Sequence, residues 1–211
     1  TMFEDEWKHN KSIVKQKLLA VLKRNSTSIP ARKCEVVSVT DQNVKQSFFN
    51  RTHIQGNGPG SVTYALEHGG DVVAMMTFIN QNNSWVLNRF ASSVRIQGGF
   101  QKLLKHFQRN HKWAEIVSFA DRRWSEGEVY FKSGFTQDKI LPPDYRYVLG
   151  DRTYHKFGFR RSALVKRLAN FDPDKSEVQN MKEAGYHRIW NCGLIRFVIT
   201  KFFPSTVAKY L

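Results

Sequence analysis

The middle of the chain changes its hydrophobic period in an order that predicts a strand–helix–strand core. Apolar and polar residues alternate over 85–92, which is typical of a strand, and apolar residues recur at helical spacing over 103–111. A short apolar run at 115–121 is typical of a buried strand. A second helix is predicted at 125–133, with Gly134 as its C-terminal capping residue.

The segments before this core predict a strand, a helix and a hairpin. Residues 34–40 are rich in valine and predict a strand, and either Thr40 or Asp41 can cap the helix that follows. Two alternating runs at 62–67 and 72–79 surround a turn with two adjacent glycines, which is a hairpin signal.

The segments after the core predict another hairpin, two helices and one strand. The hairpin is expected at 141–157, and helices are expected at 160–168 and within 172–185, where a glycine ends the second of them. Residues 186–200 predict a single strand interrupted by a glycine bulge.

Together these elements predict an α+β fold in which helices flank a central mixed sheet. Three segments are expected: a basic amphipathic helix at 1–33, a core at 34–158, and a basic helix-and-strand extension at 159–211 that packs on the core. This first helix is expected either to pack on the domain or to connect to something upstream. Because the chain opens directly in it, we expect the sequence to be a fragment of a longer protein.

The composition is that of a folded protein with room for one domain and an appendage. Of 211 residues, 41% are hydrophobic and 13% aromatic, which excludes a disordered chain. No apolar run approaches the roughly 18 residues of a membrane span, so we expect no membrane partner. Cys34 and Cys192 lack the closely spaced histidines of a zinc site, so we expect no metal and two buried thiols in a reducing cytoplasm.

Net charge points to a polyanionic partner. Lysine and arginine number 33 against 18 acidic residues, a net charge of +15, and nucleic acid is the usual partner of such a chain. Residues 141–170 hold seven Lys and Arg against two Asp, interleaved with aromatic residues that can stack on bases. We expect the arginines to point outward, toward double-stranded DNA. The residues predicted to contact its phosphates are Arg122, Arg123, Arg146, Arg160, Arg161, Lys166 and Arg167.

A glycine turn at 95–100 leads into the central helix, where free backbone N–H groups can hold an anion. Taken alone, such a turn is more often simply tight. Arg95-x-x-Gly98 at the turn, with Tyr130-x-x-x-Gly-Phe further on, resembles the GNAT-superfamily N-acyltransferases. The resemblance implies that Arg95, Gly98 and Gly99 hold the pyrophosphate of an acetyl-CoA-like donor, and that Tyr130 protonates the departing thiolate. Phe100 replaces a small residue of the family's turn, and its ring is expected to hinder the phosphate.

Several further stretches resemble the C-terminal part of phage homing-endonuclease-like proteins, in which a nuclease module, often of the very-short-patch-repair type, comes first. They are Phe3-Glu-Asp-Glu-Trp7, Ala31-Arg-Lys-Cys34, His53-Ile-Gln-Gly56, Ala120-Asp-Arg-Arg-Trp-Ser125 and Gly185-Tyr-x-Arg-Ile-Trp-x-Cys-Gly193. The resemblance implies a phage-encoded protein in the bacterial cytoplasm that positions an upstream nuclease on DNA, because this chain itself has no nuclease motif. A more distant likeness to Mom-type DNA-modification proteins of phages implies a transferase instead.

Two functions of different classes are therefore expected. The first is a DNA-binding domain, an acyltransferase fold reused for binding. The alternative is an acyl- or Mom-like transferase that modifies DNA, with Tyr130 as the general acid and with His53 and Asp121 as polar groups of the cleft. Each of the three residues also has an ordinary structural explanation: a core tyrosine, a helix-capping aspartate and a histidine that braces its loop. Convergence of all three on one cleft would favour chemistry.

Overall fold

The computed structural model describes residues 2–22, 24, 28–82 and 84–201. Part of the predicted turn at 25–30 and residues 202–211 of the predicted extension lie outside the described residues. The helices are α1 (Glu4–His9), α2 (Lys11–Val21), η1 (Ala31–Lys33), α3 (Gln42–Thr52), α4 (Gly99–Asn110), α5 (Glu128–Phe131), η2 (Lys156–Phe159), α6 (Arg161–Arg167) and α7 (Glu177–Glu183). The strands are β1 (Ser28–Pro30), β2 (Glu35–Ser38), β3 (Val62–His68), β4 (Asp71–Gln81), β5 (Ser84–Ser92), β6 (Arg95–Gln97), β7 (Glu115–Asp121), β8 (Thr136–Leu141), β9 (Tyr145–Leu149), β10 (Arg152–His155), β11 (His187–Trp190) and β12 (Leu194–Thr200).

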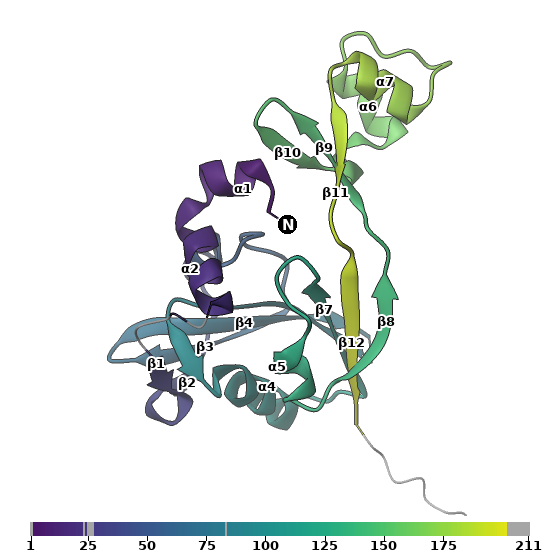
Figure 1. Cartoon of the computed structure of the whole chain (residues 1–211). Helices are drawn as coiled ribbons and strands as arrows, with labels where there is room; N and C mark the ends of the chain where they lie inside the picture. Colours follow the sequence, from purple (N-terminus) through teal and green to yellow (C-terminus); the bar gives the residue numbers. More distant parts are fainter. Residues whose placement is uncertain (1, 23, 25–27, 83, 202–211) are drawn as a thin grey trace, which may run out of the picture.

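A seven-stranded sheet in the order β2-β3-β4-β5-β7-β12-β8 forms the body of the molecule (Figure 1). Its neighbouring strands are antiparallel except β5 and β7, which run parallel. Those two strands pair only over Ser84–Val86 and Glu115–Val117, near their starts. Beyond this point they separate, and the gap between them positions the candidate site.

Alternate residues of the central strands pack against helices on opposite faces of this sheet. Leu66 and Met76 pack in the cluster that contains α4, whereas Ala65 and Met75 pack with α3. The helical spacing predicted for 103–111 is confirmed, because α4 buries its apolar face and Phe107 stacks on Phe78 with ring centroids 3.7 Å apart. The cap predicted for α3 is supplied by the Asp41 carboxylate, which accepts the N–H of Asn43 at 2.7 Å.

The N-terminal segment is two helices rather than the single one predicted, because the chain breaks at Asn10 between α1 and α2. Ile13 and Val14 are buried, but Leu18 and Leu22 on the predicted apolar face are 40% and 66% exposed. The break lets α1 lie against the hairpin of β9 and β10, while α2 approaches the end of the main sheet (Figure 1).

A second, three-stranded sheet in the order β10-β9-β11 continues from the end of the main sheet (Figure 1). Its β9–β10 hairpin was predicted, but the single strand expected at 186–200 is wrong: β11 belongs to this sheet and β12 to the main one. Gly193 lets the chain cross between the sheets, since its φ is +79° and a Cβ there would lie 2.3 Å from the carbonyl oxygen of Leu141. In each sheet, a strand that follows residue 158 therefore pairs with strands that precede it. β11 pairs with β9 in the small sheet, and β12 pairs with β7 and β8 in the main sheet.

The helix expected at 125–133 is only the short α5. The N–H groups of Trp124 and Ser125 bond to the carbonyl oxygen of Asp121, forming a turn directly after β7. Gly127, at φ +89°, then begins α5, and Gly134 ends the segment at φ +87°, as predicted. None of the helices in the described part of the chain has both the length and the apolar character needed to cross a membrane.

Candidate active site

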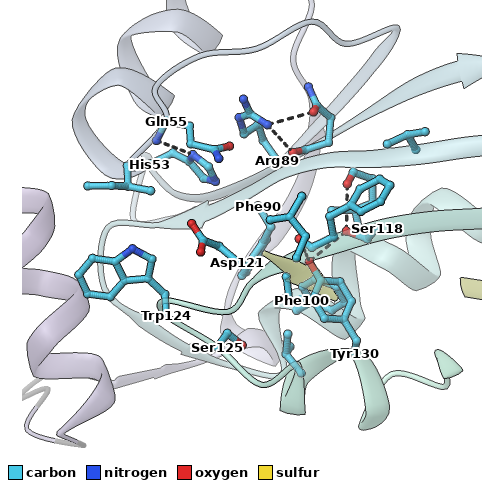
Figure 2. A pocket seen from close by; sticks show the side chains of 18 of the residues that line it. His53, Gln55, Arg89, Phe90, Phe100, Ser118, Asp121, Trp124, Ser125 and Tyr130 are labelled. Atoms are coloured by element: carbon cyan, nitrogen blue, oxygen red, sulfur yellow. Dashed lines mark hydrogen bonds between the residues drawn. The ribbon is translucent and has the colours of Figure 1, made fainter. Parts of the chain in front are cut away.

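A cavity of about 420 Å³ lies in the gap where β5 and β7 separate (Figure 2). Residues 86–90 of β5 and 118–121 of β7 form its two long walls. The three residues predicted as catalytic, His53, Asp121 and Tyr130, all line this one cavity although they come from three separate segments. The structure thus places all three residues in one cleft, as the transferase alternative required.

Tyr130 reaches the cavity from α5 with its ring held by other aromatic residues. Its ring stacks on Phe197 at 4.7 Å and meets Phe100 edge-on at 5.5 Å. The Tyr130 hydroxyl lies 2.9 Å from the Ser118 hydroxyl, which is itself 3.0 Å from the carbonyl oxygen of Leu87. Burial raises the pKa of Tyr130, so the hydroxyl is protonated at neutral pH and acts as a hydrogen-bond donor inside the cleft.

His53 follows α3 and is a neutral imidazole at physiological pH. Burial, reinforced by the positive charges of Arg89 and Lys17, lowers the pKa of His53 to about 3. Its Nδ1 accepts the backbone N–H of Gln55 at 3.2 Å. The single proton of the neutral ring is therefore on Nε2, which makes His53 a hydrogen-bond donor rather than a ready base.

Asp121 ends β7 with its carboxylate held by Arg123. The guanidinium Nε is 3.1 Å and 3.0 Å from the two carboxylate oxygens, and Nη2 is 2.7 Å from one of them. Nη1 lies 3.0 Å from Glu6 of α1. Although burial lowers the pKa of Arg123, the hydrogen bonds and charges of Asp121 and Glu6 outweigh it and the pKa is raised. The prediction that Arg123 contacts DNA phosphates is wrong, because its side chain is 1% exposed and bound to two carboxylates.

Three further cleft residues were not predicted as functional: Lys17, Arg89 and Trp124. Burial lowers the pKa of Lys17, whose ammonium lies 5.4 Å from the Trp124 ring. The Trp124 Nε1 is buried and has no hydrogen-bond partner among the described residues, so the cleft holds an unused donor. Trp124 belongs to the stretch Ala120-Asp-Arg-Arg-Trp-Ser125, which could have pointed to it. No local pattern could have pointed to Lys17, because it reaches the cleft from α2 through a long-range contact.

The glycine turn before α4 is partly paired with another segment. Arg95 lies in β6, whose backbone pairs with β1, while Gly98 is the exposed N-cap of α4 at φ +77°. Gly99 is buried, and a Cβ there would lie 2.8 Å from Ile96, so close packing alone requires glycine. Phe100 does not obstruct the turn as expected, because its ring is 3% exposed and packs inward against Phe90 and Tyr130.

The other predicted phosphate contacts lie outside this cavity. Arg146 lines two neighbouring cavities, of about 450 and 640 Å³, between the main sheet, α1 and the smaller sheet. Exposed Arg122 donates to the carbonyl oxygen of Cys192 at 3.1 Å. The remaining predicted contacts are exposed at the far end of the molecule from α4, on and beside α6 (Figure 1); they are Arg160, Arg161, Lys166 and Arg167. Within the described residues, no cluster of histidine, cysteine or carboxylate groups could hold a metal ion.

The mixed sheet flanked by helices has the fold of solved GNAT acetyltransferases. The ribosomal-protein-S18-alanine N-acetyltransferase from Escherichia coli superimposes with a TM-score of 0.52 over 84% of this chain and 99% of that one, at 12% identity. An acetyltransferase from Bacillus subtilis in complex with CoA aligns over 81% and 100% of the two chains, with a TM-score of 0.47 and 12% identity. No protein-family model and no curated protein matches the sequence. The predicted fold class is confirmed.

Proposed function

We propose that this chain is a group-transfer enzyme of the acyltransferase type, which takes an acyl-CoA-type donor in the gap between β5 and β7. The observation that carries the proposal is the convergence of His53, Asp121 and Tyr130 on the single cavity at the end of the parallel pair. A protonated tyrosine, a neutral histidine and a buried, unused indole N–H in one cleft are arranged for chemistry rather than for core packing.

The residues present fit such a donor. Its acyl group would be supplied already activated as a thioester. Gly98 is exposed at the N-terminus of the 12-residue α4, where backbone N–H groups and the helix dipole favour a pyrophosphate. The Phe100 ring turns into the core and leaves this approach clear.

The cleft residues have separate roles in this proposal. The acceptor's nucleophile attacks the thioester carbonyl, so that the bond to the acyl group forms and the C–S bond breaks. Tyr130 gives its hydroxyl proton to the leaving thiolate and is reprotonated by the proton that the acceptor loses. The Nε2–H of His53 donates a hydrogen bond to the acyl oxygen or to the acceptor. Asp121 is a positioning residue, because Arg123 already binds both of its carboxylate oxygens.

We infer that the acceptor is a base in DNA, as in the Mom-like alternative, and that the protein acts in the bacterial cytoplasm during phage infection. The net charge of +15 supports a polyanionic acceptor. The guanidinium of Arg146, which lines both cavities beside the site, supports it too.

Titration calorimetry with acetyl-CoA tests donor binding. Gly98→Trp adds a ring at the N-terminus of α4 and is expected to abolish the heat signal. Gly98→Asn is the matched control, because asparagine tolerates the left-handed backbone and adds little bulk. Wild-type protein with no acetyl-CoA signal, or a Gly98→Trp variant that binds normally, would contradict the proposal.

Tyr130→Phe tests the general acid. Phenylalanine keeps the ring stack on Phe197 and removes only the hydroxyl. We expect acetyl-CoA binding to be retained and the rate of thiol release in the presence of DNA to fall by about 10²-fold. Ser133→Ala, at the end of the same segment, is the control and is expected to leave the rate unchanged. An unaltered rate in Tyr130→Phe would exclude the assigned role.

A second candidate function is a DNA-binding domain that positions an upstream nuclease of the homing-endonuclease type. The exposed cations on and beside α6 favour it, because they lie away from the cleft and pair with no carboxylate among the residues that the structure describes. Of these cations, Arg161 donates to the backbone carbonyl of Pro173. Duplex binding that weakens steeply with salt, with no acetyl-CoA signal, would favour this function over transfer. The absence of duplex binding would exclude it.

A further inference from the structure

One face of the three-stranded sheet is covered at one end and open at the other. Tyr147 of β9 is directly opposite Arg188 of β11, and two positions along Tyr145 is opposite Trp190. Opposed residues, and residues two apart on a strand, share a face, so all four side chains belong to the same one. Tyr147 is buried with residues of α6 and α7, whereas Trp190 is 49% exposed. Beyond those helices the face presents aromatic rings to solvent.

Cations lie between these rings in an alternating row. The Arg188 guanidinium is 5.2 Å from the ring centroid of Tyr145 and also 5.2 Å from that of Trp190. The Lys156 ammonium is 5.1 Å from the Tyr145 ring and 5.7 Å from the Phe157 ring, and it is also paired with the Asp144 carboxylate at 2.5 Å. The row forms a cation–aromatic ladder made of Trp190, Arg188, Tyr145, Lys156, Phe157 and Arg160.

The ladder has the two kinds of group that an unpaired nucleic acid strand needs. At its end, the Arg160 guanidinium lies 4.7 Å from the Phe157 ring, which is 59% exposed. Cations of this kind neutralise phosphates, and exposed rings stack on bases. In a duplex each base is already stacked on its neighbours, so only an unpaired base is free to stack on a protein ring.

The ladder also leads to the candidate active site. Tyr145 and Lys156 line the cavity of about 450 Å³ together with Asp121 and Leu194. Asp121 and Leu194 line the Tyr130 cavity as well, so the two cavities adjoin. A nucleotide at the inner end of the ladder would therefore lie next to the cleft.

We propose that the cation–aromatic ladder binds an unpaired strand of nucleic acid, with bases stacked on Trp190, Tyr145 and Phe157 and phosphates on Arg188 and Arg160. The inference goes beyond the proposed transfer reaction, because the ladder binds its strand without any donor. It also differs from duplex binding by the cations near α6, which would leave the three rings unused.

Fluorescence anisotropy with a labelled oligothymidylate of about 12 nucleotides tests the ladder without acetyl-CoA. Trp190→Ala and Phe157→Ala are each expected to weaken binding about tenfold. Trp190→Phe keeps a ring and should remain within about twofold of wild type. Trp7→Ala is the matched control, because Trp7 is also exposed and carries a lysine ammonium, that of Lys11, 5.2 Å from its ring.

The same titrations with a duplex of equal length complete the test. Tighter binding of the single strand than of the duplex, lost in Trp190→Ala and kept in Trp7→Ala, supports the ladder. Equal affinity of Trp190→Ala, Phe157→Ala and wild type for oligothymidylate overturns it, as does preferential binding of the duplex. Neither result bears on acetyl-CoA binding, so failure of the ladder and failure of the transferase proposal are distinguishable.

Discussion

At the scale of single residues, Arg123 is the group that ties the candidate site to the N-terminus. Its guanidinium bonds to Asp121 at the end of β7 and to Glu6 on α1, 117 residues away in sequence. The buried guanidinium offsets part of the charge of the two carboxylates, and its loss leaves buried Glu6 and partly buried Asp121 with backbone N–H partners but no cation of their own. The Arg123 side chain therefore links the orientation of the Asp121 carboxylate to the position of α1.

Arg123→Met is expected to lower the free energy of unfolding by about 3–5 kcal/mol, because it removes the cation bound to buried Glu6 and to partly buried Asp121. Urea denaturation measures the change. Arg122→Met is the neighbouring control, and its exposed side chain predicts a loss of about 1 kcal/mol or less. Equal losses of unfolding free energy in the two variants would contradict a stabilising role for the bonds of Arg123 to Asp121 and Glu6.

The half-buried imidazole of His53 predicts a pH dependence of stability. Its folded pKa of about 3 lies below the ordinary value of 6.5, so between these values the unfolded chain binds a proton that the folded chain does not. Stability present above pH 6.5 is therefore lost as the pH falls, by at most about 1.4 kcal/mol per unit from this residue. Urea denaturation at pH 7.5 and 5 should show a smaller loss in His53→Gln than in wild type. An identical loss would show that the ring is accessible to protons.

At the scale of elements, the connection from β11 to β12 decides how the two sheets meet. Gly193 is close to the carbonyl oxygen of Leu141, at the point where β8 also leaves the main sheet toward β9. The two chain segments thus cross between the sheets side by side (Figure 1). A side chain at residue 193 would force them apart.

Gly193→Ala is expected to destabilise the protein by well over the roughly 1–2 kcal/mol that a left-handed backbone alone costs an alanine. The excess arises because the new Cβ would meet the Leu141 carbonyl at 2.3 Å. Gly150→Ala is the matched control, since its φ is also positive but nothing lies within 4 Å of the added Cβ. Thermal unfolding of the two variants separates clash from backbone strain, and similar melting temperatures would contradict the close crossing.

At the scale of the whole molecule, a GNAT-type body and a small three-stranded sheet are joined around a continuous line of cavities. The α1 helix closes one side, because Arg123 holds Glu6 and the Thr153 hydroxyl of β10 donates to Asp5. The positive charge is distributed over both parts, but the exposed cations near α6 lie far from α4 (Figure 1). Binding of nucleic acid should therefore be sensitive to the position, not only to the number, of the cations.

Arg160→Ala with Arg161→Ala is expected to weaken duplex binding and to reduce the salt dependence of log K by about two. Lys105→Ala with Arg109→Ala removes the same charge from α4 and should change the salt dependence less. Anisotropy titrations across a series of salt concentrations give both slopes. Equal reductions in the two double variants would show that net charge alone determines binding.

Much of the fold was predictable because its signals are local. The α4 face at Leu103 and Phe107, the Asp41 cap and the β3–β4 hairpin follow from periods and turn residues that neighbouring positions carry. The break at Asn10 and the edge strand β8 were missed, because an amphipathic run does not reveal where a helix is interrupted and an exposed edge strand has little apolar pattern.

The candidate site divides in the same way. Local chemistry, read with the resemblance, singled out His53, Asp121 and Tyr130, which are brought to one cavity by three separate segments. The environment that sets their protonation and bonding was decided only by packing, because Lys17, Arg89 and Glu6 reach them from distant parts of the chain. Whether an arginine is exposed, like Arg160, or buried, like Arg123, also depends on which distant carboxylates it meets. Hydrophobic period reports backbone geometry, which is local, whereas burial and electrostatics depend on long-range contacts that exist only in the folded molecule.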